Sequence, residues 1–167
     1  MPNCIHVATP HYTVEAIFSM FPIRHKTIYE PGCGDAVVLQ GAVMRGAGQV
    51  YGIDSDALLI NKARERIGTA SHIYLRSEDM LAFTPGHKID LLYCYLMHGL
   101  TEKVVQHLIA NDQRDFTVIS HNYPMWMPNS VWDTQIFQPH RRIYNGLDKY
   151  PPYSLLYYYE VKNGVVY

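Results

Sequence analysis

The stretch that decides the fold is TIYEPGCGDAVVLQGAVMRGAGQVYGID, which runs from Thr27 to Asp54. It contains a short apolar run, a turn with two glycines, a run with helical character and a second apolar run. This order predicts a strand, a crossover helix and a parallel strand. Ligands of such βαβ units bind at the carboxyl ends of the strands.

The residue types at the turn point to a particular ligand chemistry. Glu30 precedes the turn, Gly32 and Gly34 form it, and Asp54 closes the second strand, 54 − 34 = 20 residues after Gly34. Glycines let the backbone turn sharply and approach a ligand closely, because they carry no Cβ. Carboxylates accept hydrogen bonds from hydroxyls or from an ammonium group.

The pattern does not match the common phosphate-binding turns. A dinucleotide fingerprint needs a third glycine where Val37 stands, and no Lys-Ser or Lys-Thr pair follows the glycines. An acid just before the turn would repel a pyrophosphate. S-adenosylmethionine (SAM) has an ammonium, a sulfonium, a ribose diol and no phosphate, so it fits best. An ordinary βαβ unit with a chance Gly-x-Gly remains the alternative.

The stretch resembles the class I, seven-stranded, SAM-dependent methyltransferases. The resemblance implies that Glu30 and the glycines hold the methionine end of SAM, that Asp54 holds the ribose and that Asp79 faces the adenine. Glu78 competes with Asp79 for that role, and Asp79 could instead be a solvated loop acid. The alternative for Asp54 is an acid that caps the following helix. The full set of cofactor residues implied is Thr9, Glu30, Gly32, Cys33, Gly34, Asp54, Ser55, Asp79, Met80 and Tyr95.

A smaller group within the class is also similar. It contains the lysine methyltransferases of the mitochondrial ATP synthase c subunit and adenine nucleotide translocase, with bacterial relatives. The lead-in Val7-Ala8-Thr9-Pro10, the turn Gly32-Cys33-Gly34-Asp35-Ala36 and the segment from Val118 to Pro128 resemble its motifs. The resemblance implies a protein lysine as the methyl acceptor.

The chain departs from the pattern of this group at three places. Ala36 replaces a usual glycine, Val37 replaces a usual arginine, and the late loop is one residue short before its Trp. Whether these two replacements, Ala36 and Val37, impair methyl transfer stays open. The stretch Tyr93-Cys94-Tyr95-Leu96 also lacks the N-P-P-[YF] with which DNA and glutamine amino-methyltransferases hold a planar nitrogen, which disfavours methylation of a base.

Aromatic side chains are the candidates for the acceptor site. A lysine amine has a pKa near 10.4 and must lose its proton before it attacks, so an apolar aromatic site would help. Aromatic faces also hold a methylated ammonium, with about 0.5 to 2 kcal/mol for each contact. The candidates to line the site are Tyr95, His98, His121, Tyr123 and Trp126, of which Tyr95, His121 and Tyr123 are the catalytic candidates. No motif assigns a base among them.

Composition and charge set the broader limits. The 167 residues and 48% hydrophobic content predict one globular domain, residues 1–167, with a lead-in and helix at 1–25 and a core at 26–167. A net charge of −1 gives no reason to expect general nucleic-acid binding. Three scattered cysteines fit a reducing compartment, and we expect no metal site, no secretory signal, no membrane span and a cytoplasmic location. The oligomeric state stays open.

Periodicity predicts alternating strands and helices followed by a terminal β-pair. The fold class is therefore α/β, a three-layer doubly wound Rossmann-like sheet, mostly parallel with an antiparallel C-terminal edge. Strands are expected at 26–30, 49–54, 71–76, 89–95, 116–120, 131–137 and 154–161, and helices at 14–21, 35–45, 56–67 and 102–110. The segments 30–35, 54–56, 77–80 and 95–98 should meet at the carboxyl edge.

Three functions remain open on these grounds. The first is a SAM-dependent methyltransferase that modifies a protein lysine. The second is a methyltransferase that acts on a small molecule or a nucleic acid. The third is a SAM-binding module without catalytic activity.

Overall fold

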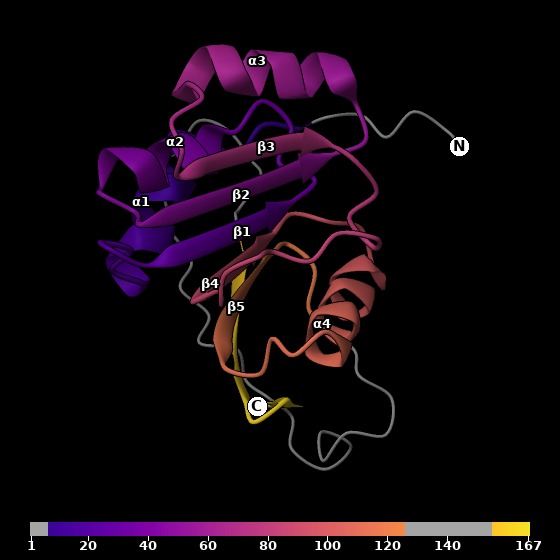
Figure 1. Cartoon of the computed structure of the whole chain (residues 1–167). Helices are drawn as coiled ribbons and strands as arrows, with labels where there is room; N and C mark the ends of the chain where they lie inside the picture. The colour runs from indigo at the N-terminus through magenta and orange to yellow at the C-terminus, as the bar shows by residue number, and fades with distance from the viewer. Residues whose placement is uncertain (1–6, 126–154) are drawn as a thin grey trace.

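A mixed sheet of seven strands forms the centre of the protein in this computed structural model, which describes residues 7–125 and 155–167. The strand order is β3-β2-β1-β4-β5-β6-β7 (Figure 1). The first five strands pair in parallel, whereas β6 and β7 run antiparallel. The predicted fold class is therefore confirmed.

The elements follow one another along the chain in the predicted alternation. They are α1 (His11–Met20), β1 (Thr27–Pro31), α2 (Val37–Met44), β2 (Gln49–Asp54), α3 (Ala57–Ile67), β3 (Ile73–Ser77), β4 (Leu91–Cys94), α4 (Leu100–Ala110), β5 (Phe116–His121), β6 (Leu156–Lys162) and β7 (Val165–Val166). The strand expected at 131–137 lies outside the described residues.

Helices cover both faces of the sheet and give three layers. Ile17 of α1, Leu39 of α2 and Ile60 of α3 pack in one apolar core on one face. Val104 and Leu108 of α4 pack in a second core on the opposite face (Figure 1). All four residues of β4 are buried, because this central strand is covered on both sides.

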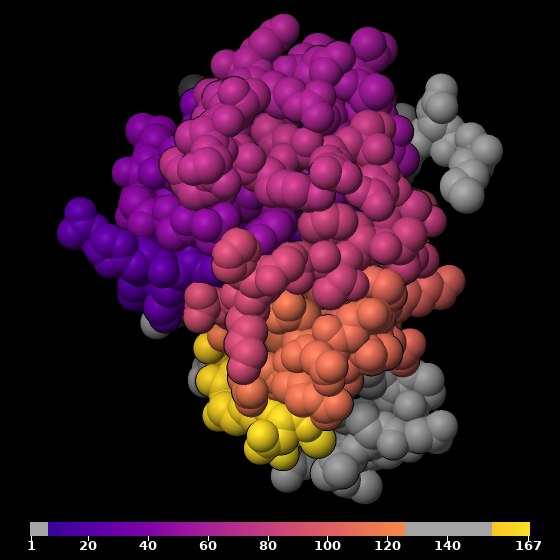
Figure 2. Space-filling model, in the orientation of Figure 1, coloured from indigo at the N-terminus to yellow at the C-terminus, as the bar shows by residue number. Residues whose placement is uncertain are grey.

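The segment after β3 lies against α4 on the second face. Figure 2 shows the two side by side, and His107 of α4 makes the contact. Its Nε2 lies 3.0 Å from the Thr84 hydroxyl and 3.1 Å from the Phe83 carbonyl oxygen.

Helix α1 begins earlier than the expected residue 14, at His11, with Pro10 at its N-cap and Thr13 inside the helix. In α3, Leu58 is 72% exposed, whereas Ile60 is buried. The helix packs on the sheet through Ile60 and Ala63, three residues apart.

The C-terminal hairpin of β6 and β7 turns at Asn163 and Gly164. Asn163 and Gly164 have φ of +53° and +76°, as a two-residue type I′ turn requires. No helix within the described ranges has both the length and the apolar character needed to cross a membrane.

The topology marks one edge of the sheet as the place for a ligand. The chain builds β1, β2 and β3 outward in one direction and then returns to add β4 on the other side of β1. The carboxyl ends of β1 and β4 therefore border the point at which the strand order reverses, where open α/β sheets bind their ligands.

Candidate functional site

The glycine turn after β1 has a backbone that only a few residue types adopt readily. Gly32, Gly34 and Ala36 have φ of +69°, +54° and +63°. A Cβ at Gly32 would lie 2.9 Å from the Leu96 side chain beyond β4 and 3.8 Å from Cε of Met80. The turn therefore sits where the segments after β1, β3 and β4 meet.

Hydrogen bonds tie this turn to the end of β2. The backbone N–H groups of Gly32 and Cys33 both donate to the Ile53 carbonyl, at 2.7 and 3.1 Å. The N–H of Gly34 donates to Oδ2 of Asp54 at 2.9 Å. The two predicted halves of the cofactor site, the turn and the acid after β2, are thus in direct contact.

Asp54 is not the cap of α3, which was its alternative role. Its Oδ1 accepts the Asp56 N–H at 2.9 Å, whereas Asp56 itself caps the helix by accepting from the N–H groups of Leu58 and Leu59. Asp54 is half-buried at the carboxyl edge, and both of its oxygens have lone pairs left for a further donor.

Glu30 is the most unusual acid at this edge. It is 5% exposed, and its Oε2 is buried without a hydrogen-bond partner. Burial, and then the charges of Asp35 and Asp54, raise the pKa of the Glu30 carboxyl well above its ordinary value. A buried carboxyl oxygen without a hydrogen-bond partner is costly, so this group is suited to a cationic ligand.

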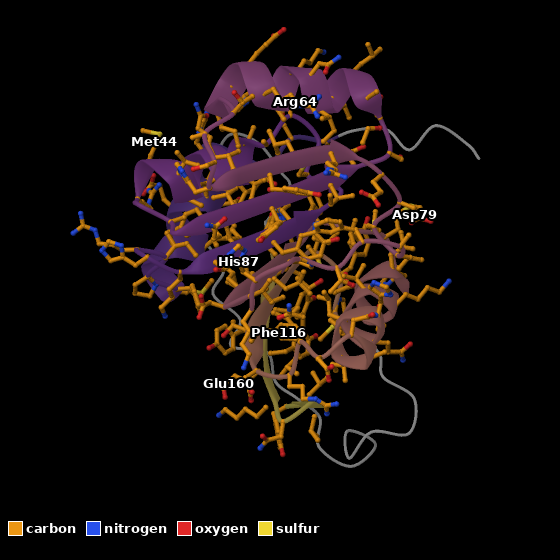
Figure 3. All side chains as sticks on the ribbon, in the orientation of Figure 1. Met44, Arg64, Asp79, His87, Phe116 and Glu160 are labelled. Atoms are coloured by element: carbon orange, nitrogen blue, oxygen red, sulfur yellow. The ribbon has the colours of Figure 1, made fainter. Side chains whose placement is uncertain are left out.

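The loop after β3 contributes less than the other segments. The Glu78 N–H donates to the Asp54 carbonyl at 3.1 Å, and the Ser77 hydroxyl donates to the Ser55 carbonyl at 3.3 Å. Asp79 is exposed, and its Oδ1 accepts the Leu81 N–H at 2.9 Å, so it stabilises the turn of its own loop (Figure 3).

Aromatic side chains gather at the ends of β4 and β5. The rings of Tyr95 and His121 stack with centroids 4.0 Å apart, and His98 meets Tyr123 edge-on at 4.8 Å. Burial lowers the pKa of His121 to about 4, so its imidazole is neutral at physiological pH. Its Nε2 is buried without a hydrogen-bond partner.

A buried polar chain joins the N-terminal lead-in to this aromatic group. The Thr9 hydroxyl lies 3.1 Å from the Tyr93 hydroxyl, which lies 2.8 Å from Nδ1 of His121. Three candidate residues are therefore linked, because Tyr95 stacks on the same His121. Trp126 lies outside the described residues.

The sequence did not point to three further residues at this edge. Tyr93 connects Thr9 to His121, and Asn122 donates from Nδ2 to the Tyr95 hydroxyl at 3.2 Å. Arg66 of α3 donates to the carbonyl and the carboxylate of Asp35 at 2.8 and 2.5 Å, so a guanidinium reaches the turn although Val37 replaces the usual arginine. These contacts join residues far apart in sequence, which no local pattern reveals.

Metal binding has no visible basis in this part of the molecule. Residues 7–125 and 155–167 contain no group of three or more His, Cys, Asp or Glu side chains placed to hold an ion. The thiols of Cys33 and Cys94 are buried and free, and burial raises the pKa of both.

The fold and the edge just described define a class I, SAM-dependent methyltransferase. Residues 28–114 match a family model described as a methyltransferase domain. This match spans more than half of the 167 residues, so the chain belongs to the methyltransferase domain family. The protein is an enzyme of this class, and SAM is its methyl donor.

Solved structures share the fold at low sequence identity. An RNA methyltransferase from Salinibacter ruber, in complex with S-adenosyl-L-homocysteine, is 21% identical with a TM-score of 0.69, and the match covers 93% of this chain and 94% of that chain. A SAM-dependent methyltransferase from Thiobacillus denitrificans, also with S-adenosyl-L-homocysteine, is 15% identical with a TM-score of 0.57. That match covers 72% of this chain and 51% of the other.

Proposed function

We propose that this methyltransferase transfers the SAM methyl group to a protein lysine. The observation that carries the proposal is the aromatic group of Tyr95, His98, His121 and Tyr123 at the ends of β4 and β5, beside the glycine turn. We treat the chain as one methyltransferase domain with its site along this edge.

Glu30 and Asp54 are the proposed anchors of the cofactor. SAM supplies an electrophilic methyl group on a sulfonium, together with an ammonium and a ribose diol. The unpartnered Oε2 of Glu30 fits the ammonium, because a buried acceptor gains a charge-assisted hydrogen bond there. The half-buried carboxylate of Asp54 fits the ribose hydroxyls.

The other cofactor residues have supporting roles in this proposal. Gly32 and Gly34 keep the turn free of side chains, and Met80 supplies apolar contact above Gly32. Thr9 lies at the same edge through its contact with Tyr93. Cys33 and Ser55 offer backbone groups beside the turn and β2, Asp79 faces the adenine side, and Tyr95 borders both donor and acceptor.

Tyr95, His121 and Tyr123 suit a lysine because they add no positive charge near pH 7. A lysine must reach the site as a neutral amine, and apolar surroundings lower the pKa of an ammonium. His121 is neutral near pH 7, so it does not repel the incoming group. Tyr95 and Tyr123, which are half-buried, have ring faces that can hold the methylated product.

An RNA nitrogen is the second candidate acceptor. The Salinibacter ruber protein, which is similar along nearly its whole length, is described as an RNA methyltransferase. The net charge of −1 and the stretch Tyr93-Cys94-Tyr95-Leu96, which lacks the N-P-P-[YF] of base-methylating enzymes, make us favour lysine. A small-molecule acceptor is the remaining alternative.

The deciding experiment follows a radioactive methyl group into its acceptor. The enzyme, with Asp54→Ala as the control, is incubated with methyl-labelled SAM and a cell extract, which is then treated with protease or ribonuclease. We expect protease-sensitive label that hydrolysis releases as methyllysine. Label that ribonuclease removes would show an RNA acceptor, and label in the low-molecular-weight fraction would show a small molecule.

A further inference from the structure

Asn122, at the end of β5, makes three hydrogen bonds to two other segments of the chain. We propose that it is a positioning residue that fixes the hydroxyl of Tyr95 toward the acceptor side of the site. The inference deepens the proposed function and rests on its placing of Tyr95 in that site.

The first two hydrogen bonds hold Asn122 against the start of β6. Its backbone N–H donates to the Leu155 carbonyl at 2.7 Å, and the Leu155 N–H donates to Oδ1 of Asn122 at 2.9 Å. Asn122 has φ of +64°, a conformation in which asparagine is enriched. Its side chain thus continues the ladder that pairs His121 with Leu156.

The third hydrogen bond has a defined direction. Since the Leu155 N–H needs an acceptor, the amide oxygen of Asn122 must face Leu155, and its NH₂ group must face Tyr95. The Tyr95 oxygen therefore accepts at 3.2 Å, and the proton of the Tyr95 hydroxyl is directed away from Asn122. That proton is available to a ligand at the carboxyl edge.

The Tyr95 ring is held at its face as well as at its hydroxyl. It stacks on His121 at 4.0 Å, and the Tyr93 hydroxyl holds Nδ1 of that histidine at 2.8 Å. A ring fixed at both points loses little freedom when a ligand binds, which favours a reactive geometry. The hydrogen bond from Asn122 sets the direction of the Tyr95 O–H group.

The substitution Asn122→Asp changes only the group that sets the direction of the Tyr95 O–H bond. An aspartate keeps the size of the side chain, tolerates positive φ and still accepts from Leu155. Its second oxygen would face the Tyr95 hydroxyl and accept its proton, so the hydrogen bond would reverse. Asn111→Asp is the matched control, because Asn111 is exposed at the end of α4, where its Nδ2 donates to the His107 carbonyl at 2.8 Å.

Kinetics and a double-mutant cycle test the proposal. We expect Asn122→Asp and Tyr95→Phe each to lower kcat about tenfold, with the KM for SAM within about twofold of wild type, as the loss of one oriented hydrogen bond predicts. The double variant should be no slower than the slower single variant, because both remove the same interaction. Effects that multiply in the double variant, or an unchanged kcat in Asn122→Asp, would overturn the proposal.

A second measurement needs no acceptor and no activity. With tyrosines labelled with ¹³C at Cζ, the Tyr95 resonance is the one that disappears in Tyr95→Phe. We expect this resonance to shift in Asn122→Asp and to stay in place in Asn111→Asp, and an unshifted resonance contradicts the role of Asn122. If the wild-type enzyme methylates RNA instead of lysine, the proposed function fails, while the resonance still decides whether Asn122 orients Tyr95.

Discussion

Ala36 holds a backbone conformation that alanine rarely adopts, with φ of +63° at the start of α2. This left-handed conformation costs an L-residue about 1–2 kcal/mol, a cost that glycine does not have. The Ala36 methyl is also fully buried, and removing it loses about 0.8 kcal/mol of burial. Glycine adds about 0.5–1 kcal/mol of backbone entropy cost.

The relief of backbone strain nearly cancels the lost burial and the added backbone entropy. Ala36→Gly should therefore change the free energy of unfolding by less than about 1 kcal/mol. Ala42→Gly is the control, because Ala42 is equally buried in the same helix without backbone strain. It should lose about 2 kcal/mol from burial and helix propensity together. Urea denaturation of both variants checks the difference, and equal losses would mean that Ala36 is not strained.

His121 should make the protein sensitive to mild acid. Burial lowers its pKa from 6.5 to about 4, so below pH 6.5 the unfolded state binds a proton that the folded state does not. Stability from this group is complete above pH 6.5 and falls as the pH drops toward 4. At pH 5 the loss is about 2 kcal/mol, since each pH unit in this range corresponds to 1.36 kcal/mol.

The comparison is between the wild type and His121→Gln, by urea denaturation at pH 7 and pH 5. Other groups titrate equally in both proteins, so the difference between the two pH values isolates His121. We expect the variant to lose about 2 kcal/mol less than the wild type on acidification. An equal loss would show that His121 takes up its proton in the folded state.

At the scale of elements, α3 depends on a single capping residue. Asp56 accepts the N–H groups of Leu58 and Leu59 at 2.8 and 3.4 Å. Asp56→Ala should lower the free energy of unfolding by about 1 kcal/mol, the usual value of an N-cap. Asp56→Asn keeps an acceptor oxygen and should retain most of the stability in urea denaturation. A similar loss in both variants would assign the effect to charge and not to the cap.

The helices and strands were largely predictable from local sequence, because each has its own hydrophobic periodicity and is bounded by residues that begin or end such elements. β2 occupies the expected residues, Gln49–Asp54, and β4, Leu91–Cys94, lies within the strand expected at 89–95. Tertiary packing decides what the local pattern leaves open. Leu58 and Ile60 are both apolar, and only the position of α3 on the sheet selects which one is buried.

At the scale of the whole molecule, SAM should stabilise the folded protein. A ligand that binds only the native state at 100 times its Kd adds about 2.7 kcal/mol, which corresponds to roughly 5–10 °C in Tm for a chain of this length. Asp54→Ala should remove most of this shift in a thermal denaturation experiment. A full shift in the variant would mean that Asp54 does not hold the cofactor.

The site divides into a part that the sequence predicted and a part that it could not. Glu30, the glycines and Asp54 belong to one βαβ unit, so their proximity follows from local order. Tyr93 joins Thr9 and His121 across 84 and 28 residues of sequence, and Asn122 meets Leu155 across 33. Such contacts depend on strand order and register, which only the folded sheet defines.

The buried carboxyl of Glu30 has a consequence for the heat of cofactor binding. Because its pKa is raised, this group retains its proton to higher pH than an exposed glutamate, and an arriving ammonium would expel that proton into the buffer. Calorimetry at one pH should therefore give a more exothermic signal in Tris than in phosphate, since Tris releases more heat when it is protonated. Equal heats in the two buffers would mean that Glu30 is ionised before SAM arrives. Release of that proton as the cofactor enters would make affinity for the methyl donor rise with pH.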